Sequence, residues 1–256
     1  MAKEVATKEA VGGVPAALAT RMQADAGKGV STAQEDNLVP LIYLLQALSP
    51  QVNKRGNDYI DGAEAGSIWL RNSPHPIVNG EVGILFQPCH FHKDWVEWVP
   101  RDSGGGLVAR YENLPKDAKS VVDDKNPNKV RFVTPNGNEV METRYHAGYA
   151  ILDDGTALPY IIPLTSSGHG ISRQWMFMMN SHATADGSVV PSWARTYRLK
   201  TKQRSNAAGT WFTWEVSEGD WVNDAAYERG ARLFKAFETG TKQADLPQEG
   251  NQERAF

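Results

Sequence analysis

The feature that most constrains the fold is a succession of strand-like stretches between Gly66 and Pro163. One helix, one strand pair and a closing helix follow it. Short stretches rich in β-branched and aromatic residues alternate here with turn residues such as Asn-Gly and Asp-Gly. Residues 90–100 are the clearest case, because their side chains alternate between the two faces of a strand. The pattern predicts a mainly β (α+β) domain with flanking helices.

Three stretches place apolar residues at helical spacing. Between Asn37 and Pro50, leucines three and four residues apart predict a short helix that ends before the proline. Residues 168–182 also have one apolar face and predict a second helix. A third helix is expected to begin after Asn223, a suitable capping residue, and to end near Gly240.

The order of these elements matches an OB-fold, a small barrel with a helix between its third and fourth strands. In this mapping the helix is 168–182, the fourth strand is 193–204 and the fifth strand is 210–216. Residues 205–209 then form the loop between them. A two-sheet β-sandwich explains the strands almost as well and stays open as an alternative.

The sequence predicts three segments along its 256 residues. Residues 1–36 form an Ala-rich flexible arm, 37–240 a β-rich OB-like domain and 241–256 a disordered C-terminal tail. The two end segments have few large apolar side chains, so burial cannot offset the entropy lost on ordering.

Composition excludes several classes of protein. No run of about 18 apolar residues is present, so we expect no membrane span. The first residues do not have the form of a signal peptide, and a single cysteine, Cys89, suits a reducing compartment, which predicts a cytoplasmic protein. The net charge of −3 argues against a protein that coats DNA by bulk charge. Any nucleic-acid binding therefore requires a local basic patch.

Residues 192–216 are the candidate patch, because their first acidic residue is Glu215. In a strand, one face would carry the cations at 198, 200, 202 and 204, and the other would carry residues 193, 195, 197 and 199. We predict contacts to phosphates by the cations and to bases by the rings. The candidate residues are Trp193, Arg195, Tyr197, Arg198, Lys200, Lys202, Arg204, Trp211 and Trp214.

Because side chains alternate along strands, the rings and the cations of this stretch cannot all face one ligand. We expect some rings to contact DNA and the others to pack inside. A second strand pair, around the Gly-rich turn 103–106, is predicted to add Trp98, Arg101 and Arg110 to the same surface. The turn lacks the Lys-Ser/Thr of a phosphate-binding loop, so it does not indicate a nucleotidase.

Neither a metal site nor a catalytic site has a specific signal. His90 and His92 share a strand face beside Cys89, but a zinc site needs three or four ligands, so we expect no metal and no cofactor. The adjacent aspartates at 123–124 and 153–154 fit a loop and a turn better than a two-metal nuclease. We therefore predict a protein without enzymatic activity, and a nuclease or strand-annealing protein stays a third hypothesis.

Three stretches resemble a group of early-region proteins of tailed bacteriophages, some of which are treated as single-stranded DNA-binding proteins. They are LIYLLQALSPQV (41–52), VEWVPRDSGGGLVARYE (96–112) and WVNDAAYERGARLFKAF (221–237). The resemblance implies a non-sequence-specific single-stranded DNA-binding protein, active in DNA replication or recombination in the host cytoplasm. It supplies no binding residues of its own.

The last residues suggest further partners. The tail carries Asp245, Glu249 and Glu253 and ends in Phe256. It is partly similar to the acidic tails with which single-stranded DNA-binding proteins recruit replication or recombination proteins, although Lys242 dilutes its charge. An ordinary frayed end explains the composition as well. The alternative function is a phage regulatory module that binds a host enzyme through the aromatic strand pair.

Overall fold

The computed structural model describes residues 16–25, 38–100, 103–123, 126–207, 209–240 and 243–244. The chain divides into two compact units, Met1–Asn37 and Leu38–Phe256. In the first unit the described element is a helix, α1 (Ala16–Ala24), which the sequence analysis did not anticipate.

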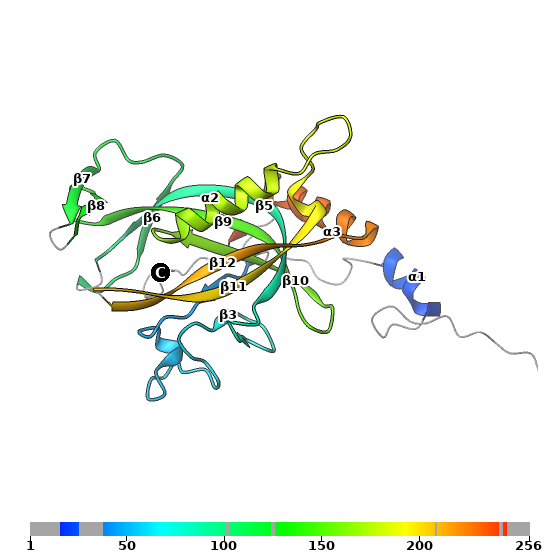
Figure 1. The fold of residues 1–256 in the computed structure, drawn as a ribbon, viewed down its shortest axis with the longest axis horizontal. Helices are drawn as coiled ribbons and strands as arrows, with labels where there is room; N and C mark the ends of the chain where they lie inside the picture. Colours follow the sequence, from blue (N-terminus) through cyan, green and yellow to red (C-terminus); the bar gives the residue numbers. More distant parts are fainter. Residues whose placement is uncertain are drawn as a thin grey trace, which may run out of the picture. The chain divides into compact units, whose positions relative to one another are not determined.

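The second unit is built on an eight-stranded antiparallel sheet (Figure 1). Its main path runs β12–β11–β5–β9–β8–β7, while β10 pairs with β9 and β6 pairs with β5. The strands are β5 (Ile84–Trp98), β6 (Leu107–Tyr111), β7 (Lys119–Asp123), β8 (Asn126–Val133), β9 (Glu139–Ile151), β10 (Ala157–Thr165), β11 (Arg195–Asn206) and β12 (Gly209–Trp221).

Two smaller sheets and two helices complete this unit. The three-stranded sheet consists of β2 (Ile42–Leu44), β3 (Ile68–Leu70) and β4 (Ile77–Val78), and β1 (Leu38–Val39) pairs in parallel with β13 (Gln243–Ala244). The helices are α2 (Gly168–Asn180) and α3 (Asp224–Glu238), and short 3₁₀ turns occur at Pro50–Val52 and Ser192–Ala194.

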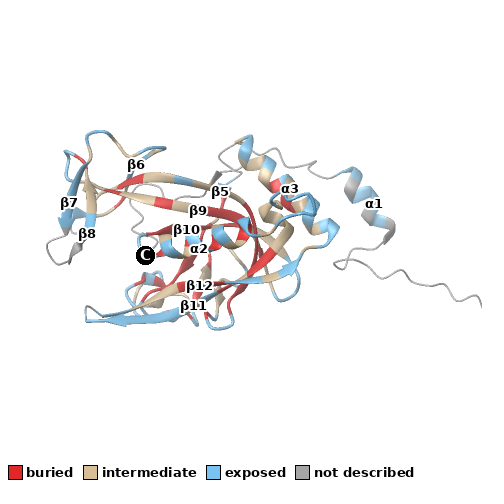
Figure 2. Ribbon diagram, turned by 45° about the horizontal axis from the view of Figure 1, so that its top comes forward, coloured by how far each residue is buried: buried red, intermediate tan, exposed pale blue. Residues whose placement is uncertain are grey.

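The main apolar core lies among the three-stranded sheet, α2, β10 and the paired ends of β5, β9, β11 and β12 (Figure 2). Trp175 of α2 is fully buried at its centre. Its ring meets Phe86 of β5 and Tyr197 of β11 edge to face, each at 5.8 Å between ring centroids. Edge-to-face contacts of this kind add to the stabilisation from burial. The predicted helix over 168–182 and its apolar face are confirmed.

Helix α3 begins as the sequence predicted. The Asn223 side chain accepts a hydrogen bond of 2.9 Å from the Ala226 N–H, which satisfies one free donor of the first turn. The helix then packs closely against Trp193, because a Cβ on Gly230 would lie only 2.6 Å from the Trp193 Cβ. The buried Gln87 amide donates to the Trp193 and Ala226 carbonyls at 2.8 and 2.9 Å, and so ties β5 to this helix.

The mainly β architecture with few helices is confirmed, but the OB-type barrel is not. The sheet is open, since its path ends at β12 and β7, which do not pair with each other in the described residues. The presence of a second sheet is consistent with an α+β or sandwich arrangement.

Two local predictions were wrong. Residues 38–49 form β1, β2 and a turn rather than a helix. The backbone of β2 pairs with β3, and this tertiary contact overrides the helical spacing of the leucines. Leu41, Leu44 and Leu45 are buried as expected, but Leu48 is 85% exposed. Asp123, expected to lie in a loop, is instead the last residue of β7 (Lys119–Asp123).

Candidate nucleic-acid interface

Strands β11 and β12 form a long two-stranded ribbon, called here the ribbon. They pair from Arg195–Trp221 at the base to Asn206–Gly209 at the tip. The pairing of β11 with β5 covers Tyr197–Leu199, so from Lys200 onward the two strands of the ribbon extend beyond β5 (Figures 1 and 2). The predicted strand pair at 193–216 is therefore present, with its turn close to the expected residues.

Hydrogen bonds from side chains and from the backbone anchor the middle of the ribbon. The Thr201 hydroxyl donates to the Gly66 carbonyl at 2.6 Å, and the Thr201 N–H donates to the Gly80 carbonyl at 2.9 Å. On β12, the Gln46 side chain bonds both the N–H and the carbonyl of Phe212, at 2.9 and 3.0 Å. These bonds fix the ribbon to the three-stranded sheet and its connections before the tip extends into solvent.

The register of the ribbon decides which side chains share a face. Arg204 lies directly opposite Trp211, Lys202 opposite Thr213 and Lys200 opposite Glu215. Directly opposed residues of an antiparallel pair point to the same side, so Trp211 accompanies the cations. Lys200, Lys202 and Arg204 are exposed, while Arg198 and Trp211 are partly exposed. We call these five residues the basic face.

The opposite face of the ribbon belongs to the core. Tyr197 is 1% exposed and Trp214 is 5% exposed, and both lie in the main apolar cluster. Neither ring can stack on a base in this arrangement, which corrects the sequence prediction for these two residues. Alternation along the strands gives the reason, because Tyr197 and Trp214 have the parity of Leu199 and Val216, which are also buried.

Trp193 and Arg195 do not belong to the basic face either. Trp193 lies in the 3₁₀ turn before β11 and packs on Phe234 of α3, with ring centroids 5.0 Å apart. The Arg195 guanidinium donates to the Gly219 carbonyl at 2.9 Å and pairs with Glu218 at 3.1 Å. Trp193 and Arg195 were both predicted to contact nucleic acid, but each contacts other residues of the protein at the base of the ribbon.

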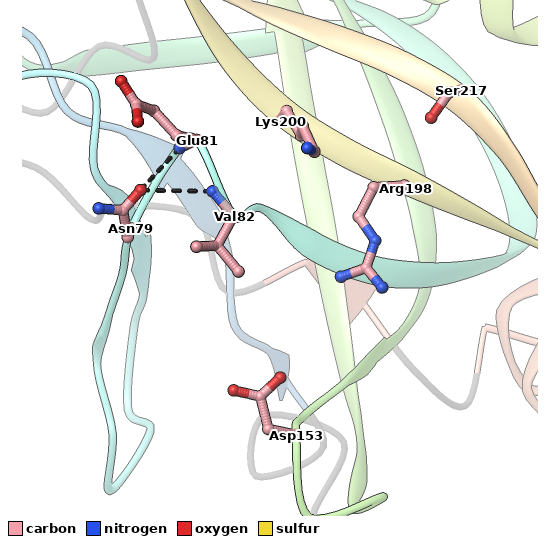
Figure 3. Close-up of a pocket in the computed structure, with 7 residues that line it drawn as sticks. All are labelled: Asn79, Glu81, Val82, Asp153, Arg198, Lys200 and Ser217. Carbon is pink, nitrogen blue, oxygen red and sulfur yellow. Dashed lines mark hydrogen bonds between the residues drawn. The ribbon is translucent and has the colours of Figure 1, made fainter.

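The basic face is only lightly neutralised by the protein's own acids. The Lys202 ammonium lies 3.5 Å from a Glu215 carboxylate oxygen, and both side chains are about half exposed. Exposed pairs of this kind contribute little and are screened by salt. Toward the base of the ribbon, Arg198, Lys200 and Ser217 line an open pocket of about 760 Å³ (Figure 3).

In the second strand pair predicted to bind nucleic acid, β5–β6, other side chains already contact the arginine. Arg110 donates a hydrogen bond to Asp94, and its guanidinium lies 5.4 Å from the centroid of the Tyr145 ring. Trp98 is partly buried and pairs with Leu107 and Glu139. Arg101 lies outside the described residues.

The register of β5 also separates the two strand pairs. Strand β6 pairs with residues 95–98 of β5, whereas β11 pairs with residues 84–86. The structure therefore does not bring Trp98 and Arg110 onto the basic face.

Three titratable side chains of β5 and β9 are largely buried, and burial shifts their pKa values. Burial lowers the pKa of His92 to about 4, against the opposing effect of Asp94, and lowers that of His146 to about 3. Burial also raises the pKa of the Cys89 thiol to about 12. In the described part of the chain, no three His, Cys, Asp or Glu side chains are grouped so that they could hold a metal ion.

The pocket residues outside the ribbon were missed by the sequence analysis. Asp153 was assigned to a turn, which is confirmed, and Glu81 lies in the turn before β5. No motif signals that both carboxylates lie beside Arg198 and Lys200, since the two loops that carry them are about 70 residues apart in the sequence.

Comparison with protein families shows the family to which this chain belongs. The model of a family described as Pam3 phage gp34-like protein matches residues 6–243. The chain belongs to this family. The predicted resemblance to phage proteins is thus confirmed at the level of a Pam3 phage gp34-like family, whose description names no DNA-binding function. No curated protein and no solved structure matches this chain. No helix in its described residues has the length and apolar character needed to cross a membrane.

Proposed function

We propose that this protein binds single-stranded DNA, without sequence specificity, through the basic face of the ribbon. The observation that carries the proposal is the register of β11 and β12. It places Trp211 directly opposite Arg204, on the same exposed side as Lys200 and Lys202.

The row of cations suits an extended phosphate backbone. Same-face residues of a strand are about 6.8 Å apart, so the row from Arg198 to Arg204 spans about 20 Å. Each phosphate that a Lys or Arg neutralises releases condensed counterions, which supplies affinity that does not depend on sequence. The ribbon carries one carboxylate, Glu215, on this face against four cations.

Trp211 supplies the contact that favours single strands. A base can stack on an exposed ring only when it has left its own duplex stack, and such stacking contributes about 1–3 kcal/mol per base. Every base has a flat face, so this contact tolerates any sequence. The proposal includes no catalytic step, and it places the protein among factors that hold strands during replication or recombination.

A salt titration tests the proposal. Fluorescein-labelled oligo-dT is titrated with the protein at several salt concentrations, beside a labelled duplex of equal length. We expect the logarithm of the binding constant to fall by about 0.7 per contacted phosphate for each tenfold rise in salt, a slope of roughly −2 to −3. The duplex should bind more weakly. Absence of oligo-dT binding at about 50 mM salt would contradict the proposal.

A further inference from the structure

An open pocket lies where the base half of the ribbon faces two loops (Figure 3). One wall is formed by Arg198 and Lys200 of β11 with Ser217 of β12, directly opposite Arg198 in the register. The other wall comes from Asn79, Glu81 and Val82, before β5, and from Asp153, in the turn between β9 and β10. A volume of about 760 Å³ falls in the range of pockets that hold small ligands.

Opposite charges face this pocket without pairing. Within the described part of the chain, Arg198, Lys200, Glu81 and Asp153 make no ion pair with one another or with other residues. Elsewhere on the ribbon, neighbouring opposite charges do pair, as Arg195 does with Glu218 at 3.1 Å. Charges held apart across a pocket suit a ligand that carries both an anionic group and hydrogen-bond donors.

The wall that carries the carboxylates is preorganised. The Asn79 side-chain oxygen accepts hydrogen bonds from the N–H groups of Glu81 and Val82, at 2.8 and 3.3 Å, which fixes the loop (Figure 3). The turn beneath Asp153 is closed by two backbone bonds of 2.9 Å between Leu152 and residues 155 and 156. Binding a ligand here therefore costs little ordering of the backbone.

We infer that the pocket takes one nucleotide of the bound strand and adds a modest preference, on top of the non-specific backbone and stacking contacts, for a base that carries an exocyclic amino group. This inference rests on the proposed function. The phosphate lies against Arg198 and Lys200, and the amino group donates to the carboxylate of Glu81 or Asp153. Carboxylates accept hydrogen bonds from cytosine N4 in this way. Thymine has a carbonyl oxygen at the equivalent position, which a carboxylate repels, so cytosine is preferred over thymine.

The test compares labelled dC20 with dT20 at one salt concentration and pH 8. We expect dC20 to bind about fivefold more tightly, the lower end of the discrimination that one good base contact provides. The double variant Glu81→Ala with Asp153→Ala should bring the dC20 to dT20 ratio close to one. Its affinity for dT20 should be retained or increased, because two negative charges near the phosphates are removed.

A matched control removes two exposed acids from the β6–β7 connection, as Glu112→Ala with Asp117→Ala, and should keep the cytosine preference. Equal binding of dC20 and dT20 by the unmodified protein would overturn the inference and leave the proposed function standing. A preference that survives in the pocket variant would also overturn it. Binding of neither oligonucleotide would overturn the proposed function, and the inference with it.

Discussion

The ribbon and the β5–β6 strand pair were both predicted to bind nucleic acid, yet the structure gives their cations different surroundings. On the ribbon, Lys200, Lys202 and Arg204 extend from an exposed face. In the β5–β6 pair, Arg110 is hydrogen-bonded to Asp94 and lies over the Tyr145 ring. A cation on a strand is therefore available to a ligand only when its cross-strand neighbours do not already satisfy it.

The register of each strand pair explains the contrast. Arg110 lies opposite Val96, whose same-face neighbour two residues earlier is Asp94. The carboxylate is therefore within reach of the guanidinium, and the two are partly buried together. On the ribbon, Thr213 and Trp211 lie opposite Lys202 and Arg204 and carry no charge. The diagonal carboxylate, Glu215, lies 3.5 Å from Lys202, but both side chains are about half exposed, so solvent and salt screen this pair.

The first prediction separates the two tryptophans of β12 by stability. Trp214→Ala removes a ring that is 5% exposed and leaves a cavity in the main core. We expect it to lower the free energy of unfolding by about 3–5 kcal/mol, measured by urea denaturation. The variant's folded fraction should bind oligo-dT nearly as well as the unmodified protein. A loss of affinity of tenfold or more without loss of stability would show that this ring contacts DNA.

Acid should destabilise the packed β5–β9 region. Burial lowers the pKa of His146 to about 3 and that of His92 to about 4, from 6.5. The unfolded chain therefore binds more protons below pH 6.5, so stability is full above that pH and falls as the pH drops toward 4. We expect a loss of roughly 2–4 kcal/mol between pH 7 and pH 5 in urea titrations. An unfolding midpoint that does not change with pH would contradict the burial of these imidazoles.

Trp211→Ala should affect binding rather than folding. The ring lies partly exposed opposite Arg204, so we expect its loss to weaken oligo-dT binding by about 1–3 kcal/mol, or roughly 5- to 150-fold. The free energy of unfolding should change by less than about 1 kcal/mol. Fluorescence anisotropy and urea denaturation measure the two effects. Unchanged affinity would contradict the proposed stacking of a base on Trp211.

The smallest expected effect is that of Arg110→Ala on DNA binding. Because Asp94 and the Tyr145 ring already engage this guanidinium, we expect affinity for oligo-dT to stay within about twofold. Arg204→Ala is the matched comparison, since it removes an exposed arginine of the ribbon and should reduce the salt slope by about 0.7. A larger effect from Arg110 than from Arg204 would reverse the contrast between the two strand pairs.

Much of the fold could be predicted because local signals and tertiary contacts agree. The helices at 168–180 and 224–238 have both an apolar face and partners that bury it, as Trp175 and Leu233 show. Residues 38–49 show the opposite case. Their leucines have helical spacing, but β3 offers backbone hydrogen bonds to Ile42–Leu44, and a strand forms instead.

The candidate site could be predicted only in part. Alternation along 195–206 correctly separates the exposed cations from Tyr197 and Leu199. The side on which Trp211 and Trp214 lie depends on the register between the two strands, and the pairing of Arg110 with Asp94 depends on the register of β6 against β5. Neither register follows from composition or spacing. The pocket depends on loops far apart in sequence, so it required the structure.

Charge reversal on the basic face tests the central claim most directly. The variant Lys200→Glu with Lys202→Glu changes two exposed residues, and its control, Arg232→Glu with Lys235→Glu, changes two exposed cations of α3. The circular dichroism of both should match that of the unmodified protein. We expect the ribbon variant to lose oligo-dT binding by at least about 100-fold at 100 mM salt, and the control to lose much less. Equal affinities for the two variants would contradict the assignment of the basic face as the binding surface.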